Sequence, residues 1–239
     1  AADLPEQARD TQVKLERAAK PSGGRGGERT RWEQLCEELE EGRTNLVGNM
    51  VVCAGAIAYQ GPFTAEYRRR LNPAWVEKVA SLRIPCAADP TVAGVLGDPV
   101  TIRSWGICGL PLDPQSVENA LIVTRSRRWP LMIDPQGQAN RWVRNLEKGP
   151  GLRVIKLSQS DLLRSLEQGV RVGVPMLLEN VPEELDAALD PVLLKQTYRS
   201  GGRTLIRLGD TDVDYSDDFK LYITSKLGNP HFAPEVCIK

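Results

Sequence analysis

The chain contains a single histidine, His231, and its five cysteines are scattered without any C-x-x-C spacing. One histidine and cysteines without paired spacing leave no basis for a zinc site, and an odd, dispersed set of cysteines argues against a disulfide framework. We therefore expect reduced, buried thiols and no metal. His231 lies between two residues suited to packing, and we assign it no catalytic role. The cysteines are Cys36, Cys53, Cys86, Cys108 and Cys237.

Net charge and long hydrophobic runs are also missing. Lys+Arg and Asp+Glu both number 31, so no overall field would attract nucleic acid or an anionic membrane. The most apolar stretch, residues 46–59, is too short to cross a bilayer. No basic, apolar and small-residue leader opens the chain. We expect no nucleic acid partner, no membrane partner and an intracellular location.

The first part of the sequence predicts helices. Residues 1–20 indicate the end of a helix, and the Gly- and Pro-rich segment 21–27 predicts a joint. This arm is either solvated or the root of a longer coiled coil. From residue 28 to 60, apolar residues recur at steps of three and four, which predicts one long helix. Its second half is apolar nearly all round and should be covered.

Shorter elements follow. Helices are predicted at 64–71 and 73–82, and the run of arginines at 68–70 is interpreted as a solvated face, with a phosphate-binding patch as the alternative. Prolines make residues 82–114 loop-rich. Ser116 is predicted to cap a short helical turn, and residues 120–125 suit either a strand or the tail of that helix.

Strands alternate with helices in the second half of the chain, which implies right-handed βαβ crossovers and an α/β fold. We predict a P-loop sandwich with a mostly parallel sheet covered on both faces, because its strands are continuously apolar. A hairpin is expected across Gly209–Asp210. Strands are expected at 130–133, 153–157, 174–178, 203–208, 212–215 and 219–224, and helices at 142–147, 160–169 and 184–197.

Residues 129–142 have the layout of a phosphate-binding P-loop, G-x-x-x-x-G-K-[ST]: an apolar run, a turn with Pro135 and Gly137, then a helix. The chemistry of such a loop is not retained. On that template Asp134 and Ala139 stand in place of the two glycines, Asn140 in place of the lysine and Arg141 in place of the hydroxyl residue.

These substitutions remove the groups that bind the phosphates and the Mg²⁺ of a nucleotide. A P-loop presents backbone N–H groups and a lysine to the phosphates, and its hydroxyl holds Mg²⁺. Asp134 would repel a triphosphate, and at a helix start it could itself accept the amide hydrogen bonds. Arg141 cannot ligate Mg²⁺, although it could still contact a phosphate.

A second strand of a working ATPase would end in two acidic residues. Here Glu179 keeps a carboxylate, but Asn180 cannot act as a base, and residues 222–225 offer hydroxyls only. We therefore predict a vestigial nucleotide pocket with no catalytic residue, no metal and no cofactor of its own. Its residues are Asp134, Pro135, Gly137, Ala139, Asn140, Arg141, Glu179 and Asn180.

Long motifs of this sequence closely resemble the fifth AAA+ module of dynein heavy chains, and the run TRSRRWPLMIDPQGQA is most similar to the axonemal members. Segment 14–32 resembles the junction where the returning stalk helix enters that module. The motifs are GPFTAEYRRRL (61–71), LGDPVTIRSW (96–105), ENALIVTRSRRWPLMIDPQGQANRWVRNLE (118–147), VPMLLENVPEELDAALDPVLLKQT (174–197) and FKLYITSKLGNPHFAPEVCIK (219–239).

The resemblance implies a non-catalytic, structural module of a microtubule motor. It would relay conformational change between the ATP-hydrolysing modules, which bind ATP and Mg²⁺, and the microtubule-binding stalk. Its partners would be the neighbouring AAA+ modules of the same heavy chain, the stalk coiled coil and, indirectly, microtubules. The location would be the cytoplasm, within the cytoskeleton and the axoneme of cilia.

Three segments are expected: the end of the stalk helix with its Gly-rich joint at 1–27, the long helix and a helical lead-in at 28–83, and an AAA+ large subdomain at 84–239, without its small subdomain. Two alternatives stay open. One is a divergent ATPase that uses Arg141 and Glu179. The other is a binding module in which residues 1–60 dock a partner as a coiled coil.

Overall fold

The computed structural model describes the backbone of residues 4–233 and the side chains of residues 28–233. The backbone forms two compact units. The first contains residues up to Val52 together with Leu71–Pro90, and the second contains Cys53–Arg70 and the chain from Thr91 onward. The three-part division expected from the sequence stays a prediction. Cys237 lies outside the described residues.

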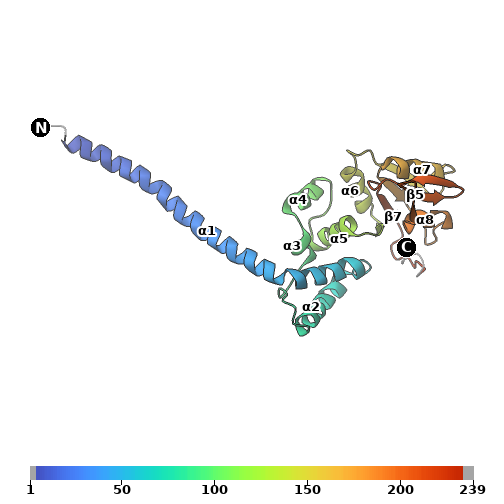
Figure 1. Ribbon diagram of the computed structural model, residues 1–239, viewed down its shortest axis with the longest axis horizontal. Coiled ribbons are helices and arrows are strands. Elements are labelled where there is room, and N and C mark those ends of the chain that lie inside the picture. The colour runs from blue at the N-terminus through green and yellow to red at the C-terminus, as the bar shows by residue number, and fades with distance from the viewer. Residues whose placement is uncertain (1–3, 234–239) are drawn as a thin grey trace. The chain divides into compact units, whose positions relative to one another are not determined.

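Helix α1, Leu4–Tyr59, runs without interruption through residues 21–27 (Figure 1). The predicted joint at 21–27 is therefore wrong. A glycine inside a helix costs only about 1 kcal/mol relative to alanine, and extending an existing helix is far easier than nucleating one. Helical turns on both sides can therefore hold a segment whose own residues disfavour the helix.

The second half of α1 is covered on one side rather than all round, which corrects our expectation. Within the first unit, segment 85–87 packs on it: the Asn49 side chain accepts a hydrogen bond from the Ala87 N–H at 2.9 Å. A Cβ on Gly48 would lie 2.3 Å from the Pro85 carbonyl oxygen, so only glycine fits there. Four apolar side chains are between 44% and 62% exposed: Leu46, Val47, Met50 and Val51.

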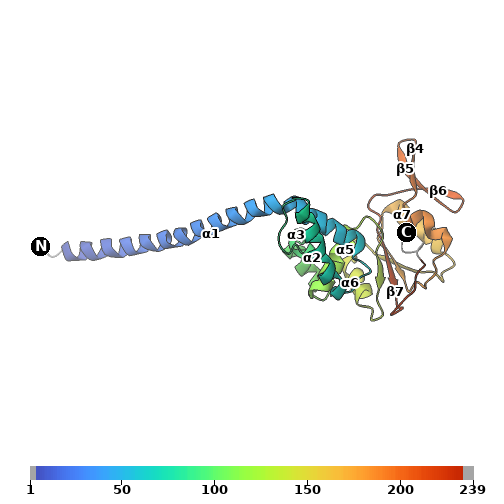
Figure 2. The same ribbon diagram turned by 90° about the horizontal axis from the view of Figure 1, so that it is seen from below.

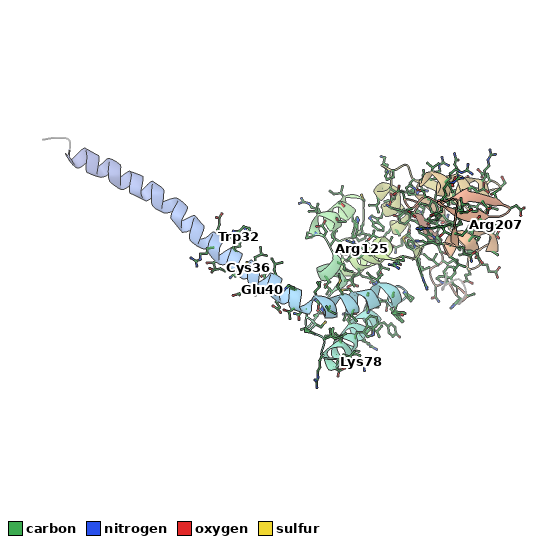
Figure 3. All side chains as sticks on the ribbon, viewed as in Figure 1. Trp32, Cys36, Glu40, Lys78, Arg125 and Arg207 are labelled. Atoms are coloured by element: carbon green, nitrogen blue, oxygen red, sulfur yellow. The ribbon has the colours of Figure 1, made fainter. Side chains whose placement is uncertain are left out.

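None of the described cysteines, Cys36, Cys53, Cys86 and Cys108, forms a disulfide. Their predicted burial holds for Cys53 but not for Cys36, which is exposed on α1. Trp32 and Cys36 both project from this helix (Figure 3), and Trp32 is 64% exposed. A tryptophan this exposed does not anchor a core of the described chain.

Helix α2, Ala65–Ser81, is continuous and contains Pro73, so the prediction of two separate helices is wrong. Proline removes one backbone hydrogen bond and often kinks a helix, but the helix can continue beyond it. Arg68 is buried, whereas Arg69 and Arg70 are exposed. A solvated face therefore describes only two of the three arginines.

The connection predicted to be loop-rich forms two helices, α3 (Val92–Leu96) and α4 (Pro99–Ile107), followed by α5 (Pro114–Arg125). The aspartates Asp98 and Asp113 cap α4 and α5, and each is followed by proline in the first turn. Asp-Pro is thus a helix start here rather than a loop signal. Ser116 is not the cap of α5, and residues 120–125 are helical.

Four parallel strands form the central sheet: β1 (Leu131–Ile133), β2 (Arg153–Lys156), β3 (Met176–Glu179) and β7 (Leu221–Ser225), in the order β1-β7-β3-β2. The inner strands β3 and β7 are buried along their whole length, and the edge strands β1 and β2 are partly exposed. The parallel sheet and its doubly buried inner strands confirm the prediction of an α/β fold.

Helices cover both faces of this sheet. Leu221 and Ile223 of β7 point into a core shared with α7 (Leu162–Val172) and α8 (Asp190–Leu193). Tyr222, between them, reaches the end of α6 (Gln138–Leu146) on the other face. Because side chains alternate along a strand, this pattern establishes three layers, the predicted P-loop-like sandwich.

A second sheet, antiparallel, has the order β4-β5-β6 and lies beside α7 (Figure 2). Its strands are β4 (Thr197–Ser200), β5 (Arg203–Leu208) and β6 (Thr211–Asp214), which confirms the predicted hairpin. The predicted helix at 184–197 is wrong. Only a 3₁₀ turn η1 (Ala187–Leu189) and the short α8 form, because Lys195 adopts a left-handed conformation, φ 49°, that ends the helix before β4.

A buried carboxylate ties the end of α6 to the start of β7. Glu147, 4% exposed, accepts hydrogen bonds from the Tyr222 hydroxyl at 2.6 Å and the Lys220 ammonium at 3.0 Å. Burial, together with the bond to Glu147 and its charge, raises the pKa of Tyr222, so the phenol stays protonated and donates. The sequence offered no sign of this cluster.

We predict that Tyr222→Phe destabilises the protein by about 1–2 kcal/mol, because a buried charged acceptor loses a donor. The free energy of unfolding in urea measures this loss. Tyr67→Phe, at an exposed tyrosine, is the control and should leave the midpoint unchanged. Equal midpoints for the wild type and Tyr222→Phe would mean that the bond contributes nothing.

Candidate functional site

The site lies where β1, β3 and β7 end, at the N-terminus of α6. The backbone N–H of Asp134 donates to the Ser225 carbonyl at 2.7 Å, which extends the parallel pairing of β1 with β7 by one residue. Gly137 then adopts a left-handed conformation, φ 73°, which L-residues rarely take, and α6 begins at the next residue. The glycine allows the chain to turn directly from the strand into the helix.

The Asp134 side chain fills the N-terminus of α6. Its two carboxylate oxygens accept hydrogen bonds from the backbone N–H groups of Gln138 and Asn140, both at 2.8 Å. Asp134 is only 6% exposed. The first amides of a helix lack intrahelical partners and carry partial positive charge, so a carboxylate satisfies both needs. These are the N–H groups that would meet a phosphate in a P-loop.

A second network joins α6 to β3. The Asn140 side-chain amide donates to Glu179 Oε1 at 2.8 Å, and the Arg144 guanidinium forms a hydrogen-bonded ion pair with the same oxygen. Arg144 also donates from Nε to Asn140 Oδ1 at 2.8 Å. The three side chains thus form a closed triangle in which the position expected for a lysine is held by an amide.

Opposing effects act on the pKa of Glu179, whose side chain is buried. Burial raises its pKa, but hydrogen bonds from Asn140 and Arg144, and the positive charges of Arg144 and Lys156, outweigh burial and leave the pKa below its usual value. Glu179 is therefore ionised at neutral pH and engaged with groups of its own chain.

A cavity of about 180 Å³ opens between these elements. Five of the eight residues predicted from the sequence line it: Asp134, Gly137, Asn140, Glu179 and Asn180. Pro135, Ala139 and Arg141 are not part of its lining, and Arg141 is exposed. The fold thus gathers most of the predicted site from two distant segments.

Three further residues belong to the site. Thr224 and Lys226, from the end of β7, line the cavity, and Arg144 bonds to Glu179. Thr224 is 2% exposed, and its hydroxyl has no partner among the described residues. The sequence shows the hydroxyls of residues 222–225, but it does not show where their strand lies in the sheet. The i, i+4 spacing of Asn140 and Arg144 was the available signal for Arg144.

No group of three or more Cys, His, Asp or Glu side chains within the described residues is arranged to bind a metal ion. The described helices likewise include none that is both long and apolar enough to span a membrane.

Known proteins resemble this chain closely. Residues 103–239 match the family described as the ATP-binding dynein motor region. The chain is 50% identical over 229 residues to human dynein axonemal heavy chain 6 and 51% identical over 226 residues to human dynein axonemal heavy chain 1. These alignments include 96% and 95% of this chain.

Human dynein axonemal heavy chain 3 is 46% identical over 237 residues, 99% of this chain. The chain spans only 5–6% of the length of these relatives. The match therefore concerns one part of very long proteins.

We predict that Glu179→Gln lowers the stability by about 1 kcal/mol at neutral pH, because the ion pair with Arg144 is lost. Since folding lowers the pKa of Glu179, its stabilisation is complete above the ordinary value of 4.5 and is lost as the pH falls through the folded-state pKa. The difference between wild type and variant should therefore shrink in acid.

Urea midpoints measured from neutral pH down to about pH 3 would check this. Glu184→Gln, at an exposed carboxylate, is the control and should not move the midpoint at neutral pH. A difference that stays constant down to the acid end would contradict the assigned ionisation.

Proposed function

The chain belongs to the ATP-binding dynein motor region family, and from this premise we propose that it is a non-catalytic, structural AAA+ module of an axonemal dynein heavy chain. Its task is to relay conformational change between the ATP-hydrolysing modules and the microtubule-binding stalk. The motifs of residues 61–71, 118–147 and 174–197 support its assignment as the fifth module of the ring.

The observation that carries this proposal is the bonding of Asp134. Its carboxylate accepts from the Gln138 and Asn140 amides, so the phosphate-binding end of α6 is filled by the chain itself. A triphosphate would have to displace this carboxylate and then lie beside it, and like charges repel. The N-terminus of α6 thus keeps the geometry of a phosphate site, but the Asp134 carboxylate occupies the place of the anion.

The remaining groups do not fit ATP with Mg²⁺ either. Asn140 brings no positive charge and is bonded to Glu179. The cavity of about 180 Å³ is smaller than the roughly 300–1,000 Å³ of typical ligand pockets. Asn180 follows Glu179 where a base would be needed, and an amide cannot accept a proton from water at neutral pH.

The alternative, a divergent ATPase using Arg141 and Glu179, receives less support. Arg141 is exposed and does not line the cavity. Glu179 is engaged by Asn140 and Arg144, so a metal would compete with an ion pair that is already formed.

The proposed partners follow from the premise. They are the neighbouring AAA+ modules of the same heavy chain, the stalk coiled coil, and microtubules indirectly. The exposed apolar side chains of α1, among them Leu39 and Met50, fit a helix that pairs with another helix of the stalk. The location would be the cytoplasm and the ciliary axoneme, with ATP and Mg²⁺ bound elsewhere in the parent motor.

Calorimetric titration of the folded chain with ATP and with ADP, each with and without Mg²⁺, tests the proposal. We expect no saturable binding stronger than about 1 mM, because the helix amides are already bonded. Micromolar, Mg²⁺-dependent affinity would overturn the proposal.

A set of variants tests separately the loss of the P-loop lysine and hydroxyl, the presence of Asp134 and the lack of a base. Asn140→Lys with Arg141→Thr should bind no ATP, because Asp134 still fills the helix start. Adding Asp134→Gly to that pair should create measurable ATP binding without hydrolysis, because Asn180 remains. Phosphate release by the double variant, or unchanged inertness of the triple variant in a folded state, would contradict our account of the cavity.

A further inference from the structure

Arg68 has a buried guanidinium but does not belong to the candidate site, so its burial needs another explanation. Arg68 is 4% exposed, although Arg69 and Arg70 next to it are exposed. Burying a charge is costly unless its donors are bonded. The bonds that Arg68 makes, all within the second unit, therefore indicate what the position does.

One set of bonds goes to the end of α1. Arg68 Nε donates to the carbonyl oxygens of Phe63 at 3.0 Å and Gln60 at 3.1 Å, and Nη2 donates to that of Gly61 at 3.3 Å. These carbonyls directly follow the last residue of α1, Tyr59. Carbonyl oxygens at the C-terminal end of a helix carry partial negative charge, so a cation there is favourable.

The other set goes to α5. Arg68 Nη2 donates to Asn119 Oδ1 at 2.8 Å, and Nη1 lies 3.5 Å from the Glu118 carboxylate. Helix α5 ends at Arg125, and the chain then enters β1 and Asp134. A single planar, rigid group therefore joins the end of the longest helix to the helix that leads into the candidate site. Lysine lacks the fork of donors to reach both sides.

We propose that Arg68 couples the C-terminal end of α1 to α5, so that loosening or turning the last turns of α1 changes the stability of α5. This inference rests on the proposed relay function and names the residue through which a disturbance of the last turns of α1 reaches α5 within the second unit. Apart from this bond, α5 packs mainly on α3, so Arg68 gives α5 a direct link to the end of α1.

The test is a mutant cycle read by hydrogen exchange on the full chain. Ala58→Gly, at an exposed position in the last turn of α1, raises local opening there. In the otherwise wild-type chain, the backbone amides of residues 117–124 in α5 should then exchange about threefold faster. In the Asn119→Ala background, which removes the shortest bond to α5 at an exposed side chain, the same change should accelerate them less than about 1.5-fold.

Gln115→Ala, at an exposed residue one turn earlier on α5, is the matched control and should keep the threefold response. Arg68→Lys should abolish the response, and Arg69→Lys should keep it. If Arg68 has only a structural role, Asn119→Ala by itself should speed the exchange of the α5 amides. Ala58→Gly should then accelerate them by the same factor with and without Asn119→Ala. That additive result would overturn the coupling.

The Asn119→Ala cycle keeps the inference falsifiable if Arg68→Lys does not fold. The proposed function fails through a different observation, Mg²⁺-dependent ATP binding by the wild-type chain. The two outcomes are independent, because the exchange of α5 amides is measured without nucleotide.

Discussion

The bonding of Asp134 to the first amides of α6 is the constraint on which the site depends. A helix N-terminus needs an acceptor, and here the acceptor is a carboxylate fixed by the pairing of its own backbone N–H with Ser225. Because α6 begins at that point, Asn140 faces β3 and meets Glu179. The amides that would bind a phosphate in a nucleotide site are thus bonded to a side chain of the same protein.

Helix α6 is attached to the sheet at both ends. Near its N-terminal end Asn140 bonds to Glu179, and Arg144 from its last turn bonds to the same carboxylate. At its C-terminal end Glu147 bonds to Tyr222 and Lys220. Each attachment has a buried carboxylate with donors from another element, an arrangement that rigidifies when every partner is present. A helix held in this way is fixed to the sheet by several bonds, which fits the proposed structural role better than exchange of a ligand.

Misleading local signals account for most of the incorrect predictions. Proline and glycine suggested joints and loops at residues 21–27, at Pro73 and at Asp98-Pro99, yet each lies in or at the start of a helix. The predicted helix at 184–197 is wrong for another reason: Val192 and Leu193 are buried in the core and Lys195 is left-handed, so a short helix is followed by a strand. Tertiary packing overrides propensities of about 1 kcal/mol per residue.

The sequence by itself determined the alternation of strands and helices, the P-loop layout at 129–142 and the loss of its lysine and hydroxyl, because these are properties of neighbouring residues. It also identified Glu179 and Asn180 as the matching strand end. Only the tertiary structure decided that β7 lies between β1 and β3, which brings Thr224 and Lys226 to the cavity. It alone revealed that Arg68 is buried and that Glu147 meets Tyr222, 75 residues away. Strand order and long-range pairing depend on which surfaces bury each other, and no local pattern encodes that choice.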